Sequence, residues 1–308
     1  MVTCLCEWHH RGMKLLLLAL ALVACKGRTE PLPTPAEKTA LANAACPWVT
    51  GAYFFEVVKD GRTSHILGTR HMGVGLAKFP ETVRNSLDSA SLLVEEVAPG
   101  EHDKPTFPYE PLREELGSKD WAHVEELLGE DTAKRMETKQ SILVALLLIV
   151  MFEDLTAMLD KEIEARAKEQ AIPGAGLETS AFQFDLLGKL MDVRLLKALL
   201  AETPDRAKLR KLTHDGLERY CTGTEKDTEV MDGVDEQQML AHGYTKADLD
   251  NFHELLLYKR NTDWIPKLEK IFEQDNVFVA VGAGHLRGPR GVIELLKARG
   301  YAITRITK

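Results

Sequence analysis

The chain has 308 residues, of which 44% are hydrophobic and 28% are charged, as in ordinary globular proteins with a sizeable core. Its formal net charge is −8 at pH 7 and no basic stripe stands out, which argues against a general nucleic-acid-binding protein. The length allows one large domain or two small ones.

Residues 1–24 are predicted to be a signal peptide rather than part of the fold. In "MKLLLLALALVAC", the basic Lys14 precedes an apolar run that ends in small residues before Cys25. This order is typical of secretory signals, and the run is too short for a membrane-spanning helix. Because Met13 is the better start of such a peptide, we interpret residues 1–12 as a mis-called extension.

The end of this segment, "LVAC", resembles the bacterial lipobox. The resemblance implies cleavage before Cys25 and attachment of lipid to that residue, in a protein of the bacterial cell envelope. Lys26 follows Cys25, which under the usual sorting pattern indicates the outer membrane, facing the periplasm or the surface. The alternative is a plain signal peptide with a chance cysteine. Residues 25–46 are rich in proline and have few bulky apolar side chains, so we expect a lipid-anchored tether before a domain over 47–308.

Two further cysteines, Cys46 and Cys221, remain in the predicted mature chain. A disulfide between them is a hypothesis that suits an oxidising compartment. Their spacing in the sequence does not show that their Cα atoms come close enough to be bridged.

The start of the predicted domain has a strand-rich pattern. Residues 52–58 and 63–68 predict a hairpin around an Asp-Gly turn, because two strand-like runs flank that pair. Pro80 suits the first turn of a helix that closes at residues 88–89. The next strand is expected over 91–97.

The middle of the chain, from about residue 110 to 270, predicts mostly amphipathic helices. The uninterrupted apolar run over 142–152 is about half of a membrane span, which favours a buried core helix over a re-entrant or partner-binding segment. The C-terminal end returns to strand, helix and strand. The pattern predicts an α/β fold of the α+β type, with strand-rich ends that form a central mixed sheet around a large helical insert.

Two strands end in the same four-residue frame, Gly-x-x-His. One frame is Gly68 to His71, and the other is Gly282 to His285. A glycine at a strand end permits a sharp turn or a close approach, and ligands bind beyond the carboxyl ends of such strands. Each histidine alone is more often a satisfied turn residue, but the repeat of the frame favours two imidazoles in one metal site.

The glycines of the second frame do not form a dinucleotide-binding loop. That motif requires G-x-G-x-x-G at the start of a helix, with an acidic residue about 20 positions later. Here the glycines are residues 282, 284 and 288, and the chain ends in "ITRITK" without an acid. We therefore predict no nucleotide cofactor.

The acidic pair Glu95-Glu96 ends the strand "LLVEEV". Adjacent strand residues point to opposite faces, so only one of the two can join the site. An unpaired carboxylate in a mostly buried strand is costly, and a metal or an arginine would offset that cost. The alternative is a solvated acidic strand end.

Several of these segments together closely resemble the TraB/GumN family, which includes the TIKI-type metal-dependent proteases. The resemblance rests on "ILGTRH", "LDSASLLVEE" and "VFVAVGAGHLRGPRGVIELLKARGY". These match the family's G-T-x-H corner, its L-V-x-E strand and its long C-terminal motif. "GLETSAFQ" and "YKRNTDW" are similar to two shorter family segments. The resemblance covers roughly residues 48–308.

The resemblance implies site residues. It places His71, Glu95 and His285 as catalytic residues and as ligands of a divalent ion, manganese or cobalt in the family. Glu178, Arg260 and Asn261 fall on secondary motif positions with binding roles. Two positions depart from the family pattern. Arg70 replaces an aliphatic residue and sets a positive charge beside the site, so we expect a binding role for it as well, and Val97 stands where an acid is frequent.

The implied chemistry is metal-assisted hydrolysis of a peptide or protein substrate. Glu95 is either a ligand or the general base. Arg260 either clamps a substrate carboxylate or oxyanion, or forms an ion pair that steadies its helix. One hypothesis is therefore a lipid-anchored metallohydrolase, most simply a peptidase. The other is a non-catalytic binding or regulatory lipoprotein on the same scaffold.

Overall fold

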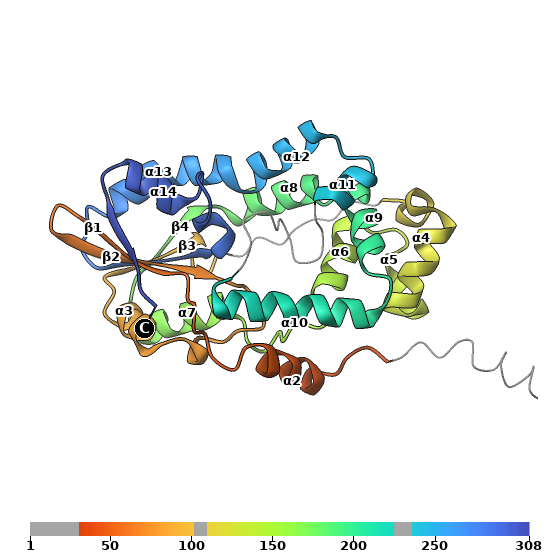
Figure 1. The fold of residues 1–308 in the computed structure, drawn as a ribbon, viewed down its shortest axis with the longest axis horizontal. Coiled ribbons are helices and arrows are strands. Elements are labelled where there is room, and N and C mark those ends of the chain that lie inside the picture. Colours follow the sequence, from red (N-terminus) through yellow and green to blue (C-terminus); the bar gives the residue numbers. More distant parts are fainter. Residues whose placement is uncertain (1–30, 102–109, 225–235, 308) are drawn as a thin grey trace, which may run out of the picture. The chain divides into compact units, whose positions relative to one another are not determined.

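The structure is a computed structural model that describes residues 31–101, 110–224 and 236–307 (Figure 1). Pro33–Lys308 form one compact unit around a six-stranded mixed sheet with the strand order β4-β3-β5-β2-β1-β6. The prediction of a mixed sheet built from both ends of the chain, around a helical insert, is confirmed. The predicted signal peptide and Cys25 lie outside the described residues.

The hairpin is formed by β1 (Phe54–Lys59) and β2 (Arg62–Thr69). Lys59 pairs with Arg62, so the turn consists of Asp60 and Gly61, with φ angles of 51° and 76°. Two central residues with positive φ match the right-handed twist of antiparallel strands, which explains why an Asp-Gly pair stands here.

The centre of the sheet is parallel. β5 (Val277–Gly282) lies between β2 and β3 (Leu92–Val97), and β4 (Gly174–Glu178) extends the parallel part beyond β3. On the other side, β6 (Ala302–Arg305) pairs with β1 in antiparallel orientation. Because β2, β3 and β5 run in the same direction, the residues that follow them meet at one edge of the sheet.

Helices cover both faces of the sheet (Figure 1). One face carries α3 (Glu81–Asp88) and α7 (Leu159–Glu169), and the other carries α13 (Lys259–Ile271) and α14 (Val292–Ala298). With helices on both sides, β5 is buried from Val277 to Val281, which accounts for its unbroken apolar run.

The helical insert has an apolar core of its own, separate from the core around the sheet. The apolar run over 142–152 contributes α6 to this core, where Ile142, Val144 and Leu148 are buried. Among the described residues, no helix has the length and apolar character needed to span a bilayer. The helices of the insert are α4 (Leu112–Leu128), α5 (Glu130–Met136), α6 (Ser141–Ile149), α8 (Ser180–Leu190), α9 (Val193–Glu202), α10 (Arg206–Thr222), α11 (Glu236–Ala241) and α12 (Lys246–His253).

Two elements differ from the sequence-based expectation. Residues 25–46 were expected to be a tether, but α2 (Pro35–Ala45) is a capped helix that contacts α10 and buries Leu41, Ala42 and Ala45. Alanine is a strong helix former and a small core residue, so a buried face with Leu41 as its one bulky side chain gave a weak helix signal. β4 is a strand within the interval expected to be helical, and its five residues include two glycines, a weak strand signal.

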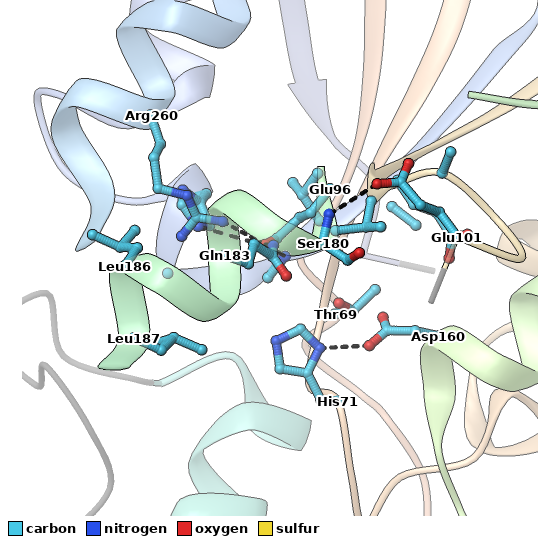
Figure 2. Close-up of a pocket in the computed structure, with 18 of the residues that line it drawn as sticks. Thr69, His71, Glu96, Glu101, Asp160, Ser180, Gln183, Leu186, Leu187 and Arg260 are labelled. Atoms are coloured by element: carbon cyan, nitrogen blue, oxygen red, sulfur yellow. Dashed lines mark hydrogen bonds and ion pairs between the residues drawn. The ribbon is translucent and has the colours of Figure 1, made fainter. Parts of the chain in front are cut away.

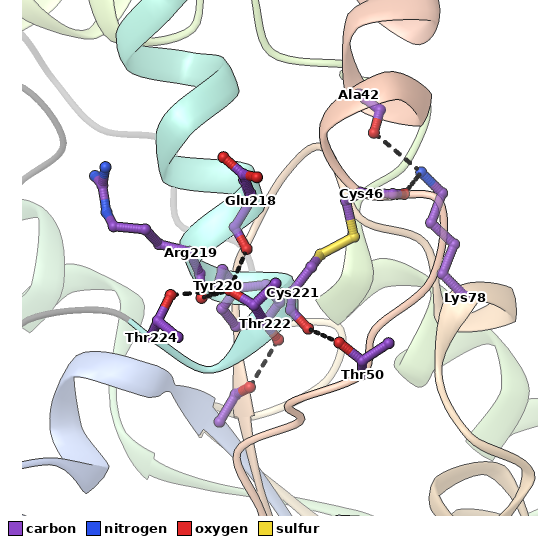
Figure 3. The surroundings of a disulfide bond; sticks show 11 residues. Ala42, Cys46, Thr50, Lys78, Glu218, Arg219, Tyr220, Cys221, Thr222 and Thr224 are labelled. Carbon is purple, nitrogen blue, oxygen red and sulfur yellow. Dashed lines mark hydrogen bonds between the residues drawn. A yellow bond between two sulfur atoms is a disulfide. The ribbon is translucent and has the colours of Figure 1, made fainter.

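A disulfide joins Cys46, at the end of α2, to Cys221 in α10 (Figure 3). The two Cα atoms are 5.8 Å apart, a normal separation for a bridge. The main-chain oxygen of Cys221 accepts hydrogen bonds from the amides of Thr50 and Gly51 at 2.8 and 2.9 Å. The bridge therefore holds the start of the sheet domain to the helical insert.

Replacing Cys46 and Cys221 by serine is expected to lower the free energy of unfolding by about 2–5 kcal/mol, because the bridge closes a long loop in the unfolded chain. Urea denaturation of the mature domain with and without reductant measures this loss. The urea midpoint of the double variant should not change when reductant is added. A wild-type midpoint that is equally insensitive to reductant would show that the bridge does not form.

Candidate functional site

A pocket of about 580 Å³ opens at the edge where β2, β3 and β5 end. It is lined by residues from these strands and from α7, α8 and α13, and it contains both predicted histidines (Figure 2). The structure thus brings together His71 and His285, which are more than 200 positions apart in the sequence.

His71 follows β2 and lies on the α7 side of the pocket (Figure 2). Its Nδ1 atom is 2.5 Å from Oδ2 of Asp160, at the start of α7. The negative charge of Asp160 raises the pKa of His71, although the histidine side chain is 62% exposed and water screens part of that field. The carboxylate fixes the ring through Nδ1 and leaves Nε2 directed to the pocket side near Gly282.

His285 lies in a single turn, η3 (Ala283–Leu286), directly after β5. Asn261 donates an amide hydrogen bond to the main chain of Arg290 at 2.9 Å, which turns its Oδ1 atom to His285 Nδ1 at 2.6 Å. The Nδ1 atom of His285 is therefore the protonated one, and Nε2 keeps its lone pair. Burial lowers the pKa of His285 to about 3, so the ring is neutral, which is the form that binds metals.

The carboxylate beside His285 is Glu96, and the prediction of Glu95 for this place is wrong. Glu96 Oε1 lies 3.7 Å from His285 Nε2 and accepts a hydrogen bond from the Gly282 amide at 2.8 Å. Its Oε2 atom accepts bonds from Arg260 and Gln183, both at 2.7 Å. Burial by itself would raise the pKa of Glu96, but His285, Arg260, His71 and the Gly282 amide outweigh it and hold the pKa well below its ordinary value.

Strand alternation explains the error. β3 places Glu95 on the opposite face, towards α7, where the nearby charges belong to Asp160, Lys161 and Glu164. The L-V-x-E pattern, read on Leu93-Val94-Glu95-Glu96, already puts the acid at the second glutamate. Glu95 lines the pocket, but its Oε2 atom is buried without a hydrogen-bond partner, and burial raises its pKa to about 9.

Arg260 is a structural ion-pair partner in this fold. Its Nη2 atom reaches Glu178 Oε1 at 2.5 Å as well as Glu96, and its Nε and Nη1 atoms donate to Glu178 and to the main chain of Leu256. These bonds use four of the five guanidinium donors. Of the two alternatives for Arg260, the structure favours the ion pair over the substrate clamp.

Of the remaining predicted binding residues, Glu178 supports the site from outside the pocket and Arg70 does not contribute to it. Glu178 also accepts a bond from Trp264 Nε1 at 3.1 Å, and the Trp264 ring lies 4.3 Å from the His285 ring. Arg70 does not line the pocket and instead pairs with the buried Glu153 at 2.6 Å. The predicted binding role of Arg70 is therefore not supported by its position.

Two residues of the site were not predicted. Asp160 lies in a helix whose sequence gives no motif, and only the fold shows that it orients His71. Gln183 ends the segment "GLETSAFQ" and bridges Glu96 and Glu178 at 2.7 and 2.8 Å. The final glutamine of that segment was a signal for this second residue.

The donor atoms suit a divalent ion. The side chains of His71, His285 and Glu96 surround Gly282, where a Cβ atom would lie 3.1 Å from Glu96 Oε1, 3.7 Å from His285 Cδ2 and 3.9 Å from His71 Nε2. Imidazole and carboxylate ligands match manganese, cobalt or zinc. Among the described residues, one group of three possible ligands has its donor atoms within 4.8 Å of one another: His214, Asp215 and Glu218 on α10. The donor atoms of His71, His285 and Glu96 are spaced more widely than that.

The fold and the site define an α/β protein with two imidazoles and a carboxylate at the carboxyl edge of a mixed sheet. The chain belongs to the TraB/PrgY/gumN family, whose model matches residues 53–305. It is also 28% identical over 149 residues to a metalloprotease of Xenopus tropicalis, TIKI1, in a region that covers 45% of this chain and 28% of that relative. No solved structure matches the chain.

Replacement of Arg260 by methionine is expected to cost about 3–5 kcal/mol of stability, because it leaves two buried carboxylates unpaired. The matched control is Arg290→Met, which breaks an exposed pair with Glu254 and should cost about 0–1 kcal/mol. Thermal and urea unfolding of both variants measure the difference. Equal losses would contradict the central role of Arg260.

Proposed function

We propose that this protein is a metal-dependent hydrolase, most simply a peptidase. The observation that carries the proposal is the orientation of the two imidazoles. Asp160 and Asn261 each hold an Nδ1 atom, at 2.5 and 2.6 Å, so that the Nε2 atoms of His71 and His285 are left for a ligand. Side-chain partners of this kind fix the tautomer and the orientation of metal-binding histidines.

Different residues of the pocket are suited to metal binding, proton transfer and substrate binding. Glu96 is held as a carboxylate whose Oε1 atom faces His285, so it is suited to be a ligand or a proton acceptor. A divalent ion, with manganese or cobalt as the candidates, would polarise a scissile carbonyl and lower the pKa of water. α8 and the π-helical turn η2 (Glu254–Tyr258) supply apolar residues to the pocket, including Leu187 and Leu257, which suit a peptide chain.

The resemblance to a named metalloprotease supports peptide or protein as the substrate. The "LVAC" segment and the apolar run before it support lipid attachment at Cys25 and a place in the bacterial envelope, at the outer membrane. The enzyme would then act on substrates outside the cytoplasm, where the Cys46–Cys221 disulfide is stable.

A second candidate is a non-catalytic binding or regulatory lipoprotein. It is favoured by the wide spacing of the three donor groups and by the two bonds that Glu96 Oε2 already makes, to Arg260 and Gln183. Metal analysis separates the two candidates.

The mature domain is expected to hold one divalent ion per chain, and His285→Ala or Glu96→Gln should remove it. His214→Ala is the control, because His214 belongs to the other group of possible ligands. Elemental analysis of the purified proteins, with a peptidase assay before and after chelator, measures both effects. Loss of the ion in the control with retention in His285→Ala would move the site to α10, and a metal-free wild type would favour the binding protein.

Loss of a residue that orients a histidine is expected to weaken metal binding measurably, but less than loss of a ligand. Asp160→Ala and Asn261→Ala should each weaken metal affinity by about 10–100-fold, as removal of outer partners does in other sites. Competition with a chelator of known affinity gives the constants. Asp185→Ala, which removes an exposed carboxylate on α8 paired with Lys189, should leave the affinity unchanged.

A further inference from the structure

The pocket has a second functional wall, on the side of α7, where Glu95 projects away from the proposed metal ligands. We propose that Glu95 forms a subsite for a positively charged group of the substrate, a primary ammonium or a guanidinium. The identification of that ligand as a substrate rests on the proposed hydrolase function. The subsite itself rests on four features of the pocket.

The first feature is a buried carboxyl oxygen without a partner. Glu95 is 5% exposed, it lines the pocket, and its Oε2 atom has no hydrogen-bond partner. Glu96, its neighbour, is bonded to Arg260, Gln183 and the Gly282 amide. Leaving a buried carboxyl unpaired destabilises the fold. A group that enters the pocket from outside would supply the missing partner.

The second feature is another unpartnered atom on the same face. Glu95 is aligned with Ala280 and Thr69 with Gly282 in the parallel ladder, so both side chains project to the face of α7. Thr69 is 3% exposed, lines the pocket, and its Oγ1 atom is buried without a partner. A carboxyl oxygen and a hydroxyl oxygen together are acceptors for a ligand that carries several N–H donors.

The third feature is the charge of α7. Asp160 and Glu164 stand one turn apart beside Glu95, and both line the pocket. Each of these two acids has a basic partner: Lys161 pairs with Glu164 at 2.9 Å, and His71 lies 2.5 Å from Asp160. The wall therefore has one acidic group, Glu95, more than it has basic groups, and a cation from outside the chain would balance the set. The ammonium of Lys161 shows that an amine is compatible with this surface.

The fourth feature is the apolar wall across the pocket. Leu186 and Leu187 of α8 stand apart from Asp160 in Figure 2, and Phe184 and Leu257 complete this lining. Lysine and arginine side chains combine an apolar stem with a charged head. A pocket with one apolar and one acidic wall is suited to such a side chain.

A second metal ion is a less suitable occupant. Two of the three acids on this wall are already paired, Asp160 with His71 at 2.5 Å and Glu164 with Lys161 at 2.9 Å. Glu95 would give a metal ion a single carboxyl ligand, whereas an organic cation carries several N–H donors of its own. The pairing therefore favours an amine or a guanidinium.

The test uses pairs of peptides that differ only in lysine or norleucine at one position, scanned across the cleavage site. The wild-type mature protein, loaded with its metal, is expected to cleave the best lysine peptide with at least tenfold higher kcat/KM than its norleucine partner. Glu95→Gln should reduce this ratio to near one. Glu126→Gln, which removes an exposed carboxylate on α4, should keep the wild-type ratio.

Glu95→Gln is also expected to unfold at a temperature no lower than the wild type, since it removes an unpaired buried carboxyl. The subsite would be rejected if Glu95→Gln kept the wild-type ratio of kcat/KM values for the lysine and norleucine peptides. It would also be rejected if the wild type showed no preference for lysine. A clear fall in the unfolding temperature would reject it too, because it would show that Glu95 stabilises the fold. If the protein binds a second divalent ion, and this ion is lost in Glu95→Gln but kept in His285→Ala, the ligand of the subsite is a metal and not an amine.

Failure of the hydrolase proposal is distinguishable from failure of the subsite. If no peptide is cleaved, calorimetric titration of the same lysine and norleucine peptides into wild type and Glu95→Gln measures binding directly. Preferential binding of the lysine peptide that is lost in the variant would keep the subsite on a binding protein. Equal binding of both peptides would reject it.

Discussion

The site depends on one buried ion pair, that of Arg260 with Glu96 and Glu178. The arginine comes from α13 and the two carboxylates from the ends of β3 and β4, so the pair ties three elements together at the edge of the sheet. α13 also carries Asn261 and Trp264, which contact His285. The position of one proposed ligand, Glu96, is thereby coupled to the orientation of another, His285.

The topology explains why this coupling is needed. β5 enters the sheet between β2 and β3 although it comes from the far end of the chain, and the whole helical insert lies between them in sequence. The two Gly-x-x-His corners become neighbours only through this long-range pairing. The Cys46–Cys221 bridge and the hydrogen bond from Tyr220 to the Gly68 main chain at 2.8 Å connect the insert to the first corner.

Much of this arrangement was predictable from local patterns, and the rest required the fold. Alternating and continuous apolar runs, bounded by turn residues, predicted the hairpin, β3 and β5. The repeated Gly-x-x-His frame predicted that His71 and His285 share one site. α2 was missed because its buried face is largely alanine, and β4 because glycine gives little strand signal. Asp160 has no motif, since its role is defined only by what packs beside it in space.

The choice between Glu95 and Glu96 shows what strand alternation leaves undecided and what the L-V-x-E pattern, read in register, would have supplied. Alternation along a strand established that the two carboxylates face opposite sides, but not which side holds the histidines. In the structure Glu96 has partners within the chain, and Glu95 has a buried oxygen with none. The fold supplies hydrogen-bond partners to Glu96 but not to the buried oxygen of Glu95, and both residues line the same pocket. The stability of the fold therefore does not explain why an acid stands at position 95. A ligand from outside the chain explains it.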